Sequence, residues 1–147
     1  MKRWGIRAWV IGLMALMALA ANSPARAGDP GLEVGQVWTV RNAPNPELRA
    51  LIARIEPFGK SDIVVHISLT GVLMQNPDGE SVLTTASHLP FEQSVLVASL
   101  DTLVETGQPL DAHFATGYQI WLDDEGGIFT VPVAEVVSLL LNPVPPD

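Results

Sequence analysis

The chain has 147 residues, with 8 Lys and Arg against 16 Asp and Glu, three His and no Cys, which gives a formal net charge of −8. The missing cysteine excludes disulfides, thiolate metal sites and a thiol nucleophile. The negative charge disfavours nucleic acids and anionic membrane surfaces as partners, because an acidic surface repels their phosphates. An apolar content of 48% indicates a folded chain rather than a disordered one.

The N-terminal segment has the three parts of a secretion signal. These are a basic start, an apolar run and small residues before a cleavage point: Lys2, Arg3 and Arg7; residues 8–21; and Ala25 and Ala27 before Gly28. The apolar run is too short for a membrane-spanning helix, which needs roughly 20 residues. The sequence therefore predicts a cleavable signal peptide over residues 1–27, a periplasmic or secreted protein, and no stable membrane anchor after cleavage.

Charge is distributed unevenly in the rest of the chain, for which we predict a single globular domain over residues 28–141 and a flexible tail over 142–147. Removal of the signal leaves four basic residues, all between Arg41 and Lys60, against all 16 acidic ones. From Ser61 onward there are twelve acidic residues and no basic one. Such an acidic surface either keeps an exported protein soluble or meets a basic partner or divalent cations, with the basic segment as a separate patch.

The first half of this domain has the alternating pattern of β-strands. In the clearest case, Val65 and Ile67 share one side with other apolar residues, while His66 and Ser68 face the opposite way. Proline- and glycine-containing turns separate the runs, which favours an antiparallel meander. The predicted strands are residues 36–41, 48–56, 62–70 with a continuation to 75, and 81–86.

The apolar spacing changes to a helical period after Pro90. The pattern predicts a main packing helix from about 91 to 106, with Gly107 after its end. Residues 111–125 fit a helix or a strand; the spacing of Phe114, Tyr118 and Trp121 favours the helix. A last strand over 127–131 and a short helix over 134–141 complete an α+β fold with an antiparallel sheet of four to five strands.

A set of short phrases in the same order resembles a family of small uncharacterised exported proteins of Gram-negative bacteria. The phrases are Gly35-Gln-Val-Trp38, Val65-His66-Ile67, His88-Leu-Pro-Phe91, Gly117-Tyr-x-x-Trp121 and Gly127-x-Phe-Thr-x-Pro-Val-x-Glu135. The resemblance spans roughly residues 35–137. It implies an exported single-domain protein and brings no assigned reaction or cofactor.

The sequence contains no linear catalytic motif: we find no nucleophile elbow, phosphate-binding glycine loop or zinc-protease helix. His66 and His88 could together bind a divalent ion such as zinc, since neutral imidazole is a good ligand. A histidine between a sheet and a helix more often forms structural hydrogen bonds. His88 could in particular bond the first free amides of the predicted helix.

Binding of a ligand or partner is the interpretation that the remaining side chains favour. The candidates are three basic and three aromatic residues: Arg41, Arg49 and Arg54, and Trp38, Tyr118 and Trp121. Core packing is the alternative for the aromatic residues. We expect a non-catalytic periplasmic binding or protein-interaction domain without a cofactor, whose partner is an unknown periplasmic protein, such as an exported enzyme that it blocks, or a small ligand. The alternative is a small metal-dependent hydrolase using His66 and His88.

Overall fold

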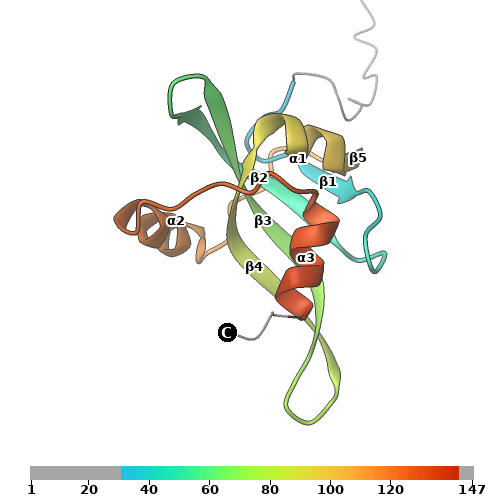
Figure 1. The fold of residues 1–147 in the computed structure, drawn as a ribbon. Coiled ribbons are helices and arrows are strands. Elements are labelled where there is room, and N and C mark those ends of the chain that lie inside the picture. Colours follow the sequence, from blue (N-terminus) through green and yellow to red (C-terminus); the bar gives the residue numbers. More distant parts are fainter. Residues whose placement is uncertain (1–30, 143–147) are drawn as a thin grey trace, which may run out of the picture.

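One antiparallel sheet of five strands organises the chain in the computed structural model, which describes residues 31–142 (Figure 1). The strand order is β4-β3-β2-β1-β5. The predicted signal peptide and nearly all of the predicted tail lie outside the described residues. The elements are β1 (Val37–Val40), β2 (Arg49–Phe58), β3 (Asp62–Gln75), β4 (Ser81–Glu92), α1 (Gln93–Ser99), β5 (Leu100–Glu105), α2 (Phe114–Asp123) and α3 (Val133–Leu141). The predicted α+β class is confirmed.

The hydrophobic core lies on one face of the sheet, beneath α1 and α3. Val65 and Ile67 of β3 belong to it, as the alternation predicted. Alternate residues of the same strand, His66 and Ser68, are also buried but point to the opposite face. Both faces of β3 are therefore covered, because α1 and α3 lie on one face of the sheet and α2 lies on the other.

The predicted helix over 91–106 is wrong in its length. Glu92 begins the helix by accepting hydrogen bonds from the amides of Ser94 and Val95, but the helix ends at Ser99. Leu100 has extended backbone angles, and the chain continues as β5, which pairs with β1 at the edge of the sheet. The expected single packing helix is thus a short helix followed by a strand. The role proposed for His88 at the helix start belongs instead to Glu92.

A bulge explains why β5 carries a helical spacing of apolar residues. Trp38 pairs with Leu103 and Val40 pairs with Leu100, so β5 contains one residue more than β1 between these two pairs. The bulge lets leucines three positions apart both approach the core, although a regular strand would place them on opposite faces. Spacing alone does not distinguish this bulged strand from a helix.

β4 is longer than the predicted strand because it continues through Pro90. Proline lacks an amide donor, which an edge strand such as β4 tolerates. Its carbonyl accepts a hydrogen bond of 2.8 Å from the amide of Phe129, and the amide of Glu92 donates to the carbonyl of Phe129. These contacts form one isolated bridge, so the predicted strand over 127–131 is wrong.

The remaining helices agree with the sequence pattern. Residues 114–123 are helical, and α3 covers the region predicted as a closing helix, with Val133, Val136 and Val137 buried. None of the helices within residues 31–142 has the length and apolar character to cross a membrane.

Candidate functional site

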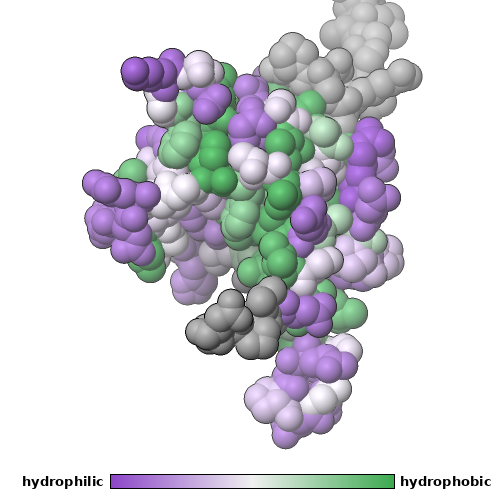
Figure 2. Space-filling model, viewed as in Figure 1, coloured by the Kyte–Doolittle hydropathy of each residue, from purple (hydrophilic) through white to green (hydrophobic). Residues whose placement is uncertain are grey.

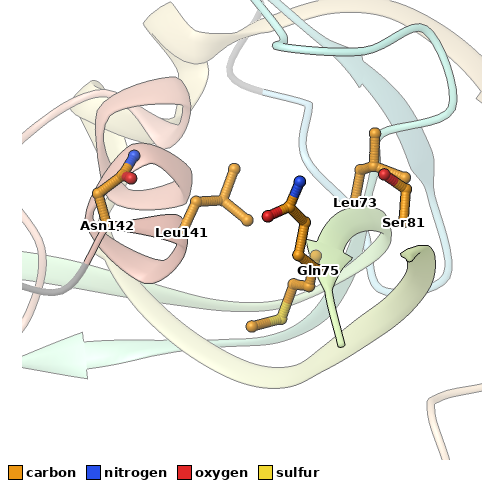
Figure 3. A pocket seen from close by; sticks show the side chains of 6 residues that line it. Leu73, Gln75, Ser81, Leu141 and Asn142 are labelled. Carbon is orange, nitrogen blue, oxygen red and sulfur yellow. The ribbon is translucent and has the colours of Figure 1, made fainter. Parts of the chain in front are cut away.

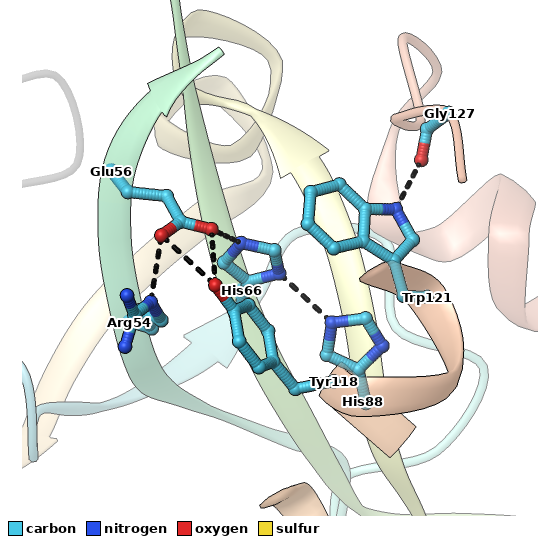
Figure 4. A network of polar contacts seen from close by, with 7 residues as sticks. All are labelled: Arg54, Glu56, His66, His88, Tyr118, Trp121 and Gly127. Atoms are coloured by element: carbon cyan, nitrogen blue, oxygen red, sulfur yellow. Dashed lines mark hydrogen bonds and ion pairs between the residues drawn. The ribbon is translucent and has the colours of Figure 1, made fainter. Parts of the chain in front are cut away.

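Polar side chains from β2, β3 and β4 meet beneath α2, on the face opposite the core (Figure 4). Arg54 of β2 is directly opposite His66 of β3, and Glu56 lies two residues further along, on the same side of its strand. His88 comes from β4 and Tyr118 from α2. Strand alternation and register therefore bring together residues that are far apart in the sequence. We call these five residues the Glu56 network.

Glu56 is the centre of this network. Its carboxylate accepts hydrogen bonds from Arg54 Nε at 2.8 Å and from the Tyr118 hydroxyl at 2.9 and 3.1 Å. The third donor is His66 Nε2, 2.9 Å from Glu56 Oε1. Three donors from three elements thus share one carboxylate, and charge-assisted bonds of this kind are stronger than neutral ones.

His66 extends the network to β4. Its ring is fully buried, and its Nδ1 lies 2.8 Å from Nε2 of His88. Because the ionised Glu56 carboxylate can only accept, His66 Nε2 carries the proton, and its Nδ1 accepts a hydrogen bond from the N–H of His88 Nε2. Both histidines are then neutral, and both nitrogens of His66 are occupied.

The pKa values follow from burial and these hydrogen bonds. Desolvation lowers the pKa of His66 and outweighs the opposing effect of Glu56. Burial, together with the adjacent His66, lowers the pKa of His88 to about 4. Desolvation raises the pKa of Glu56, but the bonds from Arg54, Tyr118 and His66 together bring it below its ordinary value. At neutral pH the network holds one cation, one anion and two neutral imidazoles.

Aromatic rings surround the buried imidazole. The ring of Trp121 lies edge-on to His66 with centroids 4.7 Å apart, and the ring of Tyr118 lies edge-on at 5.0 Å. The Arg54 guanidinium lies 4.8 Å from the centre of the Tyr118 ring, in cation–π range. Phe114, the buried first residue of α2, stacks near Tyr118. These contacts exclude water from His66 and join α2 to the sheet.

Two glycines make the close packing of α2 possible. A Cβ on Gly117 would lie 2.7 Å from Cβ of His88, and a Cβ on Gly126 would lie 2.2 Å from Cδ1 of Trp121. Real Cβ atoms do not approach other atoms so closely, so any side chain at either position would displace the helix or the indole. The indole also donates a hydrogen bond of 2.9 Å to the Gly127 carbonyl. The Gly117-Tyr-x-x-Trp121 phrase is thus the contact surface of α2.

The network offers little to a metal ion in its present geometry. The facing nitrogens of His66 and His88 share a proton, which leaves no space for an ion between them. Within the described part of the chain, no group of three or more His, Asp or Glu side chains is placed to hold a metal. His113, the remaining histidine, is an exposed residue at the start of α2.

The other predicted binding residues lie apart from the network. Trp38 is fully buried in the core and donates to Gln36 Oε1, as the core-packing alternative proposed. Arg41 makes an exposed ion pair of 3.7 Å with Asp101. Arg49 donates to the carbonyls of Pro46 and Leu48 and borders a pocket of about 360 Å³ with Asp101. The structure thus brings together Arg54, Tyr118 and Trp121, but not Trp38.

Glu56 and Gly117 are the site residues that sequence reasoning missed. The signal for Glu56 was present, because it follows Arg54 at the strand period and occurs on the strand before His66. The signal for Gly117 was a glycine inside a helical pattern, which costs about 1 kcal/mol relative to alanine and therefore points to a packing requirement.

Neither the sequence nor the fold significantly matches a family model, a curated protein or a solved structure.

Proposed function

We propose that this protein is a non-catalytic periplasmic binding or protein-interaction domain, exported through the signal peptide over residues 1–27. Its working form is the acidic single domain that begins at Gly28. It binds a periplasmic protein or a small ligand without a cofactor. The resemblance to exported proteins of Gram-negative bacteria agrees with this compartment, and an exported enzyme blocked by this chain is one such partner.

The observation that carries this proposal is that the centre of the Glu56 network is engaged within the network itself. Both carboxylate oxygens of Glu56 and both ring nitrogens of His66 take part in its hydrogen bonds, and none of the buried side-chain nitrogen and oxygen atoms in residues 31–142 is without a partner. Catalytic groups need a free lone pair or proton directed at a substrate. Arg54, Glu56, His66 and Tyr118 instead hold α2 against the sheet, which supports a structural role for the chemistry-bearing residues.

A capture experiment tests the proposal. The protein is purified from the periplasm after chemical cross-linking and compared, by quantitative mass spectrometry, with the Tyr118→Phe variant, which removes one hydrogen-bond donor from the Glu56 network. We expect one periplasmic component to be enriched reproducibly by both proteins at low salt. Absence of any enriched component across independent preparations, together with no saturable binding of small periplasmic solutes, would rule the proposal out.

A metal-dependent hydrolase is the second candidate, favoured by the adjacency of His66 and His88. Within residues 31–142, His88 Nδ1 takes no part in a hydrogen bond, so a rotation of this ring would free nitrogens for an ion. Elemental analysis of untagged protein and its thermal unfolding with added zinc test this candidate. A bound metal that is lost in His88→Ala would favour it over the binding domain.

A further inference from the structure

The β3–β4 hairpin extends beyond the rest of the sheet as a two-stranded arm (Figure 1). The last residue of β3 that pairs with β2 is Thr70, so the residues after it pair with β4 alone. Gly71, at the base of the arm, has a positive φ of 71°, and a Cβ there would lie 2.1 Å from the Glu47 carbonyl oxygen. This close contact requires glycine and sets the direction in which the arm leaves the sheet.

Large apolar side chains are exposed on both faces of the arm. Leu73 pairs with Leu83 on one face, and Met74 pairs with Val82 on the other. Their exposed fractions are 39% and 57% for the first pair and 38% and 41% for the second. We call these four residues, which lie on the two faces of the arm, the arm patch. Apolar side chains gathered at the surface are a feature of protein-interaction sites.

The arm patch borders a hollow against the C-terminal end of α3. This pocket has a volume of about 450 Å³ and is lined by Leu73, Met74, Gln75, Ser81, Leu141 and Asn142 (Figure 3). Leu139 and Leu140 of the same helix are also exposed. In the space-filling view, hydrophobic residues gather over α3 and hydrophilic ones over the tip of the arm (Figure 2). An apolar anchor seated here would therefore lie beside polar groups at its rim.

The electrostatic surroundings of the arm patch favour a cation. The tip of the arm carries Asp78 and Glu80, and β3, β4 and α3 contain no Lys or Arg, although Arg49 of β2 pairs with Thr70 at the base of the arm. The last turn of α3 also lacks a basic residue, so the negative end of its dipole lies beside the pocket without compensation from its own side chains. A second copy of this chain would bring two acidic tips together, which is electrostatically unfavourable.

We propose that the arm patch is the docking surface for a cationic amphipathic segment of a partner protein. Apolar side chains of the segment enter the hollow between the arm and α3, while its Lys or Arg residues face Asp78, Glu80 and the C-terminal carbonyls of α3. This proposal rests on the proposed binding function and names the surface and the chemical class of its partner.

The test measures binding of defined peptides to the exported protein by fluorescence anisotropy. The probe is a short synthetic amphipathic peptide of leucine and lysine; the comparators are a scrambled peptide of the same composition and a leucine–glutamate peptide. We expect saturable binding of the first peptide only, weakened by added salt because the charges are exposed. Equal binding of the scrambled peptide would overturn the proposal.

Substitutions on the arm test whether the peptide binds there. Leu73→Ser with Leu83→Ser, and separately Asp78→Asn with Glu80→Gln, should each weaken binding by about tenfold or more. Ile120→Ser is the matched control, since Ile120 on α2 has the same exposed fraction of 57% as Leu83. Wild-type affinity in both arm variants would overturn the proposal. Because the charge variant removes no apolar side chain, it remains informative if the leucine variant unfolds.

The same protein variants and peptides distinguish two other possible occupants of the arm patch. Self-association in sedimentation that is lost in the leucine variant would identify a second copy, and peptide binding about tenfold tighter to a chain ending at Asn142 would identify this chain's own C-terminal residues. Either result overturns the proposal. A partner captured equally by wild type and the arm variants would refute this docking surface alone, whereas failure to capture any partner refutes the binding function itself.

Discussion

His66 and His88 are joined by a hydrogen bond of 2.8 Å between Nδ1 of the first ring and Nε2 of the second. This contact links β3 to β4 through side chains and fixes the His66 tautomer that donates to Glu56. Tyr118 of α2 donates to the same carboxylate, so the position of the helix depends on a chain of contacts that crosses three strands. The following predictions test that dependence.

Removal of the Tyr118 hydroxyl should destabilise the protein. Tyr118→Phe keeps the ring that packs on His66 but deletes a donor to an ionised carboxylate. We expect the free energy of unfolding to fall by about 1–2 kcal/mol, as is typical for a hydrogen bond to a charged group. Urea unfolding followed by far-UV circular dichroism measures this change.

A double-mutant cycle shows whether the effect passes through Glu56. If it does, Tyr118→Phe should lower the free energy of unfolding clearly less in a Glu56→Gln background than in the wild type, with a coupling energy of about 1 kcal/mol. Additive effects would mean that the hydroxyl and the carboxylate do not interact. Gln119→Ala, on the exposed side of the same helix, serves as the control.

Gly117→Ala should destabilise the protein, although alanine has a higher helix propensity than glycine. In an unconstrained helix this substitution stabilises by about 1 kcal/mol. Here the added methyl would lie 2.7 Å from Cβ of His88, so α2 must shift and the network must lengthen. We expect net destabilisation and a changed near-ultraviolet circular dichroism spectrum, since Tyr118 and Trp121 report on this packing. Thr116→Ala, at an exposed position, should be neutral or stabilising; stabilisation by Gly117→Ala would contradict the proposed contact.

The stability of the protein should fall in mild acid. The pKa of His88 is lowered from its ordinary value of 6.5 to about 4 in the folded chain, by burial and by His66. Between these values the unfolded chain binds more protons than the folded one, so the free energy of unfolding decreases as pH falls from 6.5 to 4. The expected loss is about 1–2 kcal/mol, reduced because the ring is partly exposed. The lowered pKa of His66 acts in the same direction.

The variant His88→Gln isolates this contribution. Its side-chain amide can still donate to His66 Nδ1 but does not titrate in this range. Urea unfolding at a series of pH values should give a flatter profile for the variant than for the wild type. Identical profiles would show that His88 is not the group responsible.

Processing of the signal peptide can be tested by intact-mass measurement. Protein recovered from the periplasm of a Gram-negative host should begin at Gly28, because Ala25 and Ala27 fit the small-residue requirement of signal cleavage. Ala27→Leu should block or shift cleavage. Recovery of wild-type protein that still begins at Met1 would contradict the proposed export.

The sequence was sufficient for the antiparallel meander and for the two sides of β3. The period of β3 correctly assigned Val65 and Ile67 to the core, because a strand buried on one side by apolar residues cannot slip by one position without exposing them. Residues 111–125 were correctly favoured as a helix. These features depend on local spacing, which a single sequence contains.

The failures share a different physical cause. Leu100 and Leu103 have helical spacing, but a bulge created by pairing with β1 places both at the core, and the sequence does not reveal that pairing. Similarly, Glu56 becomes the centre of a site only when register and α2 bring His66 and Tyr118 to it. These positions depend on the register between strands that are distant in the sequence, which a local sequence pattern does not contain.

The central claim is that the arm patch meets a partner while the Glu56 network only holds α2 in place. Site-specific photo-cross-linking in the periplasm tests it most directly, with the photoreactive residue at Leu83 on the arm or at Gln119 on the exposed side of α2. The account predicts a discrete covalent adduct from position 83 and none from position 119. No adduct from position 83, with one from position 119, would contradict it.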